Sequence, residues 1–400
     1  MSLYLDGYAE MWYNRDIWIF TEDTVMLLKN CRILNGDFKL EKKDIYVNDG
    51  KIAFQGEAEE VVDLTGFTVI PGFIDLHIHG FKGVNVADSS VGELERMSDE
   101  LLRCGVTSFL ATTSTLEHET LIRALENVAT VMASGKGGAE ILGVNMEGPF
   151  ISPKRTGAMR AEFVRPFDEV EFLQFKEASE NSIRLMTLAP EIPENYRGIE
   201  VVLKNGAVPS IGHTDASSED IARAVSAGML HTTHLYNAMR GMTHREAGVV
   251  GGVLDSTVTA ELICDGIHIC PEVIRTTYKV LGRERLILIS DAIPLAGFDD
   301  GEYDFDGQVS IIKDGSCKLP NGTINGNVNS LFECVKRCVT RFGIPFEDAV
   351  YCASLGPAKR LGLESRKGSI EEGKDADLAV IDGDFNLKYV IKSGRIVKIS

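Results

Sequence analysis

Short apolar runs alternate with amphipathic helical segments through the long middle of this chain, and no other feature limits its fold as strongly. The apolar runs have the length and composition of buried strands. There are eight of them: Phe73–Ile78, Val106–Ala111, Ile141–Met146, Arg184–Leu188, Ala207–Ile211, His231–Leu235, Val258–Ile263 and Leu286–Ile289. The helical segments between them include Val91–Arg103, Leu121–Met132, Ser218–Ala227 with Ser218 as its cap, and Pro271–Leu281 with proline in its first turn.

This alternation over residues 71–369 predicts a (β/α)8 TIM-type barrel, whose active site is expected at the C-terminal ends of the strands. The competing fold is an open, doubly wound sheet. That fold would be favoured by a glycine-rich nucleotide-binding turn after a strand, but neither G-x-G-x-x-G nor G-x-x-x-x-G-K-S/T stands there.

Both ends of the chain are rich in short strands and turns. After an expected first strand, Met26–Leu34, the sequence Asn48-Asp49-Gly50 is typical of a hairpin turn. Short strands separated by turns are also expected near the other end, at residues 376–381, 389–391 and 396–399. We therefore predict a small β-sandwich domain built from both chain termini, residues 26–70 plus 370–400. Residues 1–25 are aromatic and acidic, lack the pattern of a signal peptide, and are expected to be dispensable.

Composition excludes several classes of partner. A formal net charge of -18 argues against a nucleic-acid or anionic-membrane surface, and no apolar stretch approaches the ~20 residues of a membrane span. The 8 cysteines are scattered without a C-x-x-C pair, which is typical of reduced thiols and predicts a cytoplasmic protein.

His77 and His79 end the first apolar run. Because residues i and i+2 of a strand point to the same face, both imidazoles can reach one point, as a divalent metal requires. A hydrogen-bonded pair without metal is the alternative for an isolated His-x-His. Other residues of metal-binding type follow later strands: Glu147, His213, His234 and Asp291. Their meeting on one rim of a barrel predicts a metal centre.

Several motifs resemble the amidohydrolase superfamily and, within it, the N-acetylglucosamine-6-phosphate deacetylase family. They are the segments at residues 71–80 (P-G-F-I-D-L-H-I-H-G), 146–150 (M-E-G-P-F), 212–214 (G-H-T), 233–239 (T-H-L-Y-N-A-M) and 290–292 (S-D-A). The resemblance covers nearly everything from Met26 to Ser400. It implies amino sugar metabolism by hydrolysis of the acetamide of a phosphosugar, which gives acetate and glucosamine 6-phosphate.

The resemblance also implies roles for single residues. Glu147, His213 and His234 resemble the metal ligands common to the family. His77 and His79, with a bridging Glu147 and Asp291, resemble the ligands of a second metal, so one or two divalent ions per chain are expected. Zinc suits these ligands, and iron or another first-row metal fits them too.

The expected chemistry is attack on the amide by water that the metal has activated. Asp291 resembles the group that accepts the water proton and delivers it to the leaving amine, while a plain ligand role can coexist. His268 resembles the histidine that contacts the substrate and polarises the acetamide oxygen, with a loop hydrogen bond as the alternative.

For the phosphate, the resemblance implies Asn237, the Ala238 backbone N–H and Arg245. In relatives this arginine reaches the substrate of a neighbouring subunit, so a homodimer with a shared phosphate site is expected. Arginine suits phosphate through bidentate donors, although Arg245 alone could be a solvated surface charge.

Two departures from the family pattern concern the sugar. Met159 stands where relatives often place His or Gln, and residues 323–331 follow a family pattern loosely. N-acetylgalactosamine 6-phosphate is therefore an alternative substrate. An amidohydrolase acting on another amide and a sugar-phosphate-binding protein without catalysis are the further alternatives. The absence of a lysine that could bridge the metals counts against the former, and the presence of Asp291 and all ligands against the latter.

Overall fold

The computed structural model describes residues 25–305 and 308–399. Contacts divide the chain into two units, one ending at Ile70 and resuming at Ile370, the other spanning Pro71–Ser369. The prediction about residues 1–25 falls outside the described residues, except for Val25.

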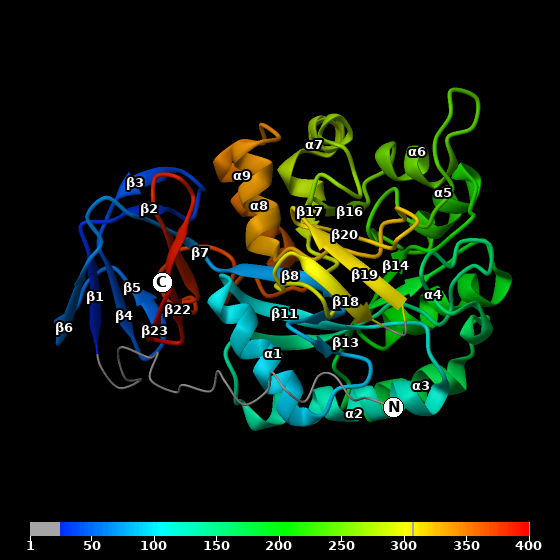
Figure 1. The fold of residues 1–400 in the computed structure, drawn as a ribbon, viewed down its shortest axis with the longest axis horizontal. Coiled ribbons are helices and arrows are strands. Elements are labelled where there is room, and N and C mark those ends of the chain that lie inside the picture. Colours follow the sequence, from blue (N-terminus) through cyan, green and yellow to red (C-terminus); the bar gives the residue numbers. More distant parts are fainter. Residues whose placement is uncertain (1–24, 306–307, 400) are drawn as a thin grey trace. The chain divides into compact units, whose positions relative to one another are not determined.

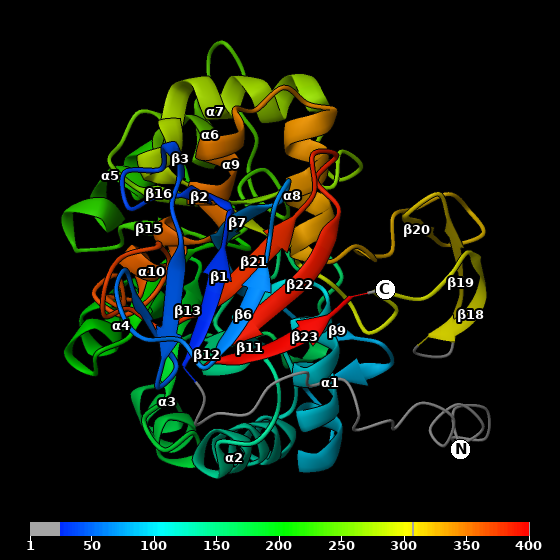
Figure 2. The same ribbon diagram turned by 90° about the vertical axis from the view of Figure 1, so that its left-hand side faces the viewer.

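The small unit contains two sheets, one of N-terminal strands alone and one that combines strands from both ends of the chain (Figure 2). The four-stranded sheet has the order β5 (Lys51–Ala53), β4 (Ile45–Asn48), β1 (Met26–Lys29) and β6 (Glu60–Asp63). The six-stranded sheet has the order β23 (Arg395–Lys398), β22 (Leu387–Lys392), β21 (Leu378–Ile381), β7 (Thr68–Pro71), β2 (Arg32–Leu34) and β3 (Leu40–Lys42).

The expected first strand, Met26–Leu34, is wrong as a single element. It is broken at Asn30, whose φ is 62°, so that β1 enters one sheet and β2 the other. The Asn30 N–H donates to Asp44 Oδ1 at 2.8 Å, which holds the break in place. Asparagine tolerates left-handed backbone better than most residues, and this local preference ends the strand.

The large unit is built on one eight-stranded parallel sheet, as predicted. Its order follows the chain backwards from β17 to β8. The strands are β8 (Phe73–Ile78), β11 (Val106–Thr113), β12 (Glu140–Met146), β13 (Ile183–Leu188), β14 (Val208–Ile211), β15 (His231–Thr232), β16 (Thr259–Ile263) and β17 (Leu286–Ile289). β15 ends at Thr232, so His234 stands in the following loop rather than in the expected strand.

The barrel closes where the first strand meets the eighth. Asp291 N–H donates to the His77 carbonyl, and His79 N–H donates to the Ala292 carbonyl, both at 2.9 Å. Asp75 is buried beside this seam and accepts from the Ser290 hydroxyl at 2.6 Å and from the Ser290 N–H at 3.2 Å. Burial raises the pKa of Asp75 to about 7.

Helices surround the barrel strands (Figure 1). They are α1 (Val91–Arg103), α2 (His118–Ser134), α3 (Glu169–Ala178), α4 (Pro193–Lys204), α5 (Ser218–Ser226), α6 (Gly248–Leu254), α7 (Pro271–Arg285), α8 (Leu331–Thr340), α9 (Phe346–Ala353) and α10 (Leu355–Arg360). The cap of α5 is Ser217 rather than the expected Ser218, because the Ser217 hydroxyl accepts from the Asp220 N–H. Within the described residues, none of these helices has the length and apolar composition needed to cross a membrane.

Shorter strands complete the large unit. β9 (Gly80–Phe81) pairs with β10 (Val84–Asn85), and β18 (Gly301–Phe305), β19 (Gln308–Lys313) and β20 (Ser316–Lys318) form an antiparallel sheet.

Candidate metal centre and active site

Six of the predicted site residues come together at the C-terminal end of the barrel. They follow or end four different strands and the β15 loop: His77, His79, Glu147, His213, His234 and Asp291. Parallel strands bring such residues to one rim although they are far apart in the chain. His77, Glu147, His213 and His234 are all less than 5% exposed, so the rim is a closed polar interior rather than a surface patch.

The first group consists of His77, His79, Glu147 and Asp291. The Nε2 atoms of the two histidines lie 3.3 Å apart, and their distances to the nearest Glu147 oxygens are 3.4 and 3.0 Å. Asp291 Oδ1 lies 3.5 and 3.4 Å from the same two nitrogens. A tetrahedral zinc ion with bonds of about 2.0–2.1 Å separates its ligand atoms by about 3.3–3.4 Å. These donors therefore fit a divalent ion.

The second group shares Glu147 with the first. Glu147 Oε1 lies 3.1 Å from His213 Nε2 and 2.6 Å from His234 Nε2, and the two nitrogens are 3.1 Å apart. The other oxygen of Glu147, Oε2, faces His79 at 3.0 Å. One carboxylate thus faces both groups, which is the arrangement that a bridging ligand requires.

The charges of the cluster depend on one another. Although burial acts to raise it, the pKa of Glu147 is held well below its usual value by His77, His213 and His234. Although burial acts to lower it, the pKa of His79 is raised to about 9 by hydrogen bonds to Asp291 and Glu147. The carboxylates therefore demand positive charge, which a divalent cation would supply in place of the protons.

Backbone strain concentrates at this rim. His213, His234 and Asp291 have φ values of 46°, 27° and 52°, and Tyr236 and Ala238 in the same loops have 84° and 47°. Left-handed backbone is uncommon for residues other than glycine and recurs at functional sites, where surrounding structure enforces it. The strained positions therefore coincide with the loops that carry the cluster.

Two of the histidines have clear partners on the ring atom that faces away from the cluster. His77 Nδ1 lies 3.0 Å from Glu261 Oε2, and His213 Nδ1 lies 2.9 Å from the Arg155 carbonyl. Sequence reasoning missed Glu261 and Arg155. A glutamate inside the apolar run Thr259–Ile263 was the available signal for the former, because a buried carboxylate needs partners. No local pattern marks a backbone carbonyl such as that of Arg155.

His268 lies just past β16 and is held by Asp265. Its Nδ1 is 2.7 Å from Asp265 Oδ2, while Asp265 Oδ1 accepts from the N–H groups of Ile267 and His268. Although burial acts to lower it, the pKa of His268 is raised by the Asp265 hydrogen bond and charge, and further by Asp291. The interaction with Asp291 places His268 within electrostatic reach of the cluster.

The residues expected to bind phosphate lie in the segment after β15. The Ala238 carbonyl accepts from Thr214 N–H at 3.2 Å, which ties this segment to the loop of His213, and Asn237 N–H donates to the His234 carbonyl at 3.0 Å. Arg245 lies farther along, on an exposed stretch. Across residues 25–305 and 308–399, no ion pair or hydrogen bond joins its side chain to the cluster. Met159 is half-buried, and its sulfur accepts from the Thr115 N–H at 3.4 Å.

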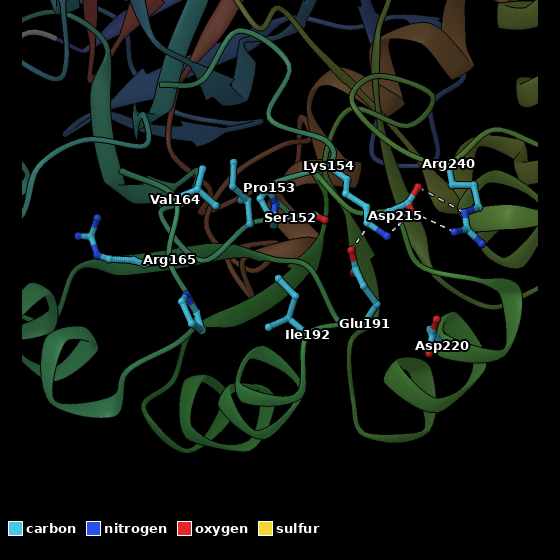
Figure 3. Close-up of a pocket in the computed structure, with 12 residues that line it drawn as sticks. Ser152, Pro153, Lys154, Val164, Arg165, Glu191, Ile192, Asp215, Asp220 and Arg240 are labelled. Atoms are coloured by element: carbon cyan, nitrogen blue, oxygen red, sulfur yellow. Dashed lines mark hydrogen bonds and ion pairs between the residues drawn. The ribbon is translucent and has the colours of Figure 1, made fainter. Parts of the chain in front are cut away.

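A pocket of about 570 Å3 lies among the loops that follow β12, β13, β14 and β15 (Figure 3). Asp215 forms its polar wall, paired with Arg240 at 2.9 Å and with Lys154 at 3.7 Å, and Glu191 accepts from the Asp215 N–H. Hydrogen bonds from Arg240 and Arg155 lower the pKa of Asp215 to about 2. None of the predicted site residues lines this pocket, so it is separate from the six-residue cluster.

Comparisons with known proteins agree with this geometry. Residues 68–397 match the amidohydrolase family. The N-acetylglucosamine-6-phosphate deacetylase of Bacillus subtilis is 37% identical over 94% of this chain and 98% of its own. The N-acetylgalactosamine-6-phosphate deacetylase of Escherichia coli O157:H7 is 31% identical over 92% of this chain and 98% of its own length. The crystal structure of N-acetylglucosamine-6-phosphate deacetylase from Pasteurella multocida superposes with a TM-score of 0.87 at 32% identity, covering 94% of this chain and 100% of that one.

Proposed function

The chain belongs to the amidohydrolase family, and from this premise we propose that it hydrolyses the acetamide of N-acetylglucosamine 6-phosphate to acetate and glucosamine 6-phosphate. The observation that carries the proposal is the pair of ligand groups sharing Glu147 beside Asp291. The relatives named for this reaction match nearly the full chain, which extends the likeness beyond the site itself.

We propose that the centre holds two divalent ions, with zinc as the best-suited metal. His77, His79, Glu147 and Asp291 would hold one, and Glu147, His213 and His234 the other. Imidazole nitrogens and carboxylate oxygens at these separations suit zinc, although other first-row metals accept the same donors. When bound, such an ion lowers the pKa of a water molecule towards ~7 and polarises a carbonyl oxygen.

Asp291 is proposed to move the protons. Although burial acts to raise it, the pKa of Asp291 is lowered by His77 and His79, so the carboxylate is ionised at neutral pH and can accept a proton. Its side chain is 19% exposed whereas that of His77 is fully buried, so Asp291 is the more accessible to substrate. The same group would then return the proton to the leaving amine.

His268 is proposed to face the acetamide oxygen. Asp265 accepts from its Nδ1–H, and when the ring is protonated Nε2–H is a second donor that can face the oxygen. The raised pKa of His268 favours this protonated form, whose charge also stabilises an oxygen that gains negative charge during the reaction.

The phosphate is proposed to bind Asn237, the Ala238 N–H and Arg245. We further propose a homodimer in which Arg245 reaches the site of the neighbouring subunit, because its side chain is exposed on its own chain. A protein with a net charge of -18 must gather positive charge locally to hold a dianion.

A second candidate substrate is N-acetylgalactosamine 6-phosphate. The relative from Escherichia coli O157:H7 is named for that sugar, and the only sulfur of Met159 is already engaged by the Thr115 N–H. The apolar side chain of Met159 offers the sugar hydroxyls no strong hydrogen bond. The two epimers differ at one hydroxyl, so Met159 would discriminate only weakly between them.

The test is acetate release from both N-acetylated 6-phosphosugars and from their unphosphorylated forms, with metal content measured on the same preparation. We expect about two metal ions per chain and a clear preference for the phosphorylated sugars. A fully metal-loaded protein that releases no acetate from either phosphosugar would overturn the proposed reaction. Equal turnover of phosphorylated and unphosphorylated sugars would overturn the proposed phosphate site alone.

A further inference from the structure

Glu261 carries a carboxylate in the interior of the barrel, in the middle of β16. Its side chain is 0% exposed. An unpaired carboxylate in such a place would cost several kcal/mol, so its retention requires partners of matching chemistry. The partners that the structure supplies all belong to the metal-binding end of the barrel or to the strand that leads there.

Three donors from different parts of the barrel converge on this carboxylate. Oε2 lies 3.0 Å from His77 Nδ1 and accepts from the backbone N–H of His234 at 3.3 Å. Oε1 lies 3.2 Å from His231 Nε2. The backbone carbonyl of Glu261 also accepts from the Leu235 N–H at 2.9 Å, next to His234. One residue thus touches a histidine from each of the two ligand groups.

The contact with His77 decides which ring nitrogen points into the cluster. An ionised carboxylate can only accept, so the nitrogen that faces it carries the proton. His77 Nδ1 is therefore the N–H, and Nε2 is left to offer its lone pair beside Glu147 and Asp291. Fixing tautomer and ring orientation in this way is how groups behind a ligand tune metal affinity.

The contact with His234 works through the backbone. His234 Nδ1 is buried and has no hydrogen-bond partner among the described residues, so no hydrogen bond at Nδ1 orients the His234 ring as Glu261 orients that of His77. Its backbone has a strained φ of 27°. The N–H bonds of His234 and Leu235 to Glu261 hold that turn in place.

We propose that Glu261 is a positioning residue for the metal centre, holding His77 by its ring and His234 by its backbone so that both Nε2 atoms face Glu147. The inference rests on the metal site of the proposed function. It differs from a purely structural role in one respect: loss of the carboxylate should weaken metal binding by the folded protein, and most strongly on the His77 side.

The test is the Glu261→Gln variant, which keeps the size of the side chain and removes its charge. Zn2+ affinity is measured by chelator competition on folded protein, and thermal unfolding is followed with and without Zn2+. We expect Zn2+ affinity to fall 10–100-fold at the site on the His77 side, in the range found for groups that orient metal ligands. The stabilisation of the protein by Zn2+ should shrink in parallel.

Glu171→Gln is the matched control, because Glu171 also accepts from a histidine, with His118 Nδ1 at 2.9 Å, but belongs to α3 outside the barrel. Its Zn2+ affinity should equal that of the wild type. Glu261→Asp keeps the charge on a shorter arm and should bind Zn2+ more tightly than Glu261→Gln.

Wild-type Zn2+ affinity in folded Glu261→Gln would overturn the positioning role. If that variant does not fold, Glu261→Asp decides, and unchanged affinity there overturns the inference. A wild-type protein that binds no Zn2+ or other divalent ion would instead overturn the metal centre of the proposed function, so the two failures are distinguishable.

Discussion

The interiors of the two units are opposites. The core of the small unit, with members such as Leu28, Ile45 and Val380, consists of buried hydrophobic side chains. The mouth of the barrel buries His77, Glu147, His213, His234 and Glu261 just as deeply. The small unit buries the ion pair of Asp377 and Lys392 beside its apolar core, whereas the barrel mouth gathers several charged and ionisable side chains into one cluster.

This difference separates stability from activity. Apolar burial contributes to folding in proportion to the area removed from water, whereas buried charges must be compensated by one another or by a cation. Substitutions in the small unit should therefore change the free energy of unfolding and leave turnover of the folded protein alone. Substitutions at the barrel mouth should do the reverse.

Asp291→Asn should show the largest difference between the effect on turnover and the effect on the free energy of unfolding. We expect kcat to fall ~10³-fold or more, since the proton-transfer group is lost, while most of the metal and the folded state are retained. Steady-state acetate release measures kcat, elemental analysis measures the metal content, and thermal unfolding measures the stability of the fold. Asp299→Asn, in an exposed position, is the control. Activity of Asp291→Asn within tenfold of wild type would remove it from the proton-transfer role.

Leu28→Ala tests the opposite side of the comparison. Leu28 is 0% exposed in β1, and its truncation should cost about 2–5 kcal/mol of the free energy of unfolding while kcat per folded molecule stays constant. Denaturant unfolding and active-site titration measure the two. Val61→Ala on β6, 59% exposed, should change stability by less than ~0.5 kcal/mol. A large fall in kcat of folded Leu28→Ala would break the separation.

Arg245→Ala tests an exposed charge, in contrast to the buried charges of the barrel mouth. Charge-assisted bonds to phosphate are worth about 1.5–3 kcal/mol, so kcat/KM for the 6-phosphate substrate should fall roughly 10–150-fold. Turnover of the unphosphorylated sugar should barely change, and exposed Arg197→Ala on α4 should have no effect. Equal losses on both sugars would make Arg245 structural.

The same variant tests the shared site. Mixing Arg245→Ala with Asp291→Asn should restore activity, because one site of a mixed dimer would contain both residues. With subunit exchange demonstrated, absence of rescue would assign Arg245 to the site of its own chain.

Asp265→Asn should have the smallest effect, confined to pH dependence. The pKa of His268 is raised, so its protonated form persists to higher pH than that of a free imidazole and is lost as pH rises through that raised value. Without the Asp265 charge, the pKa of His268 should fall, and the alkaline fall of kcat/KM should begin at lower pH. A pH–rate profile at saturating metal measures the shift. An unchanged alkaline limb would separate His268 protonation from the reaction.

Local pattern was sufficient for the barrel and its rim. Runs such as Leu286–Ile289 are apolar on both faces, and this marks strands covered by helices, so strand order and the residues at strand ends followed from the chain itself. The break at Asn30 was missed because asparagine is compatible with a strand position until tertiary contacts select its left-handed conformation. Glu261 was missed for a different reason. Its partner His77 lies 184 positions away, and no pattern along the chain reveals which inward-facing side chains of β8 and β16 will meet.

The seam at Asp75 and Ser290 has a consequence for how the protein comes into being. These two residues are 215 positions apart, and they join the first barrel strand to the last. On the ribosome, His77 and His79 emerge long before Asp291, so their complete ligand set cannot exist until nearly three quarters of the chain has been synthesised. Contacts of such long range form late and slowly in folding. The His77 side of the cluster therefore reaches its complete geometry only when the ring of strands has closed, after most of the chain has left the ribosome.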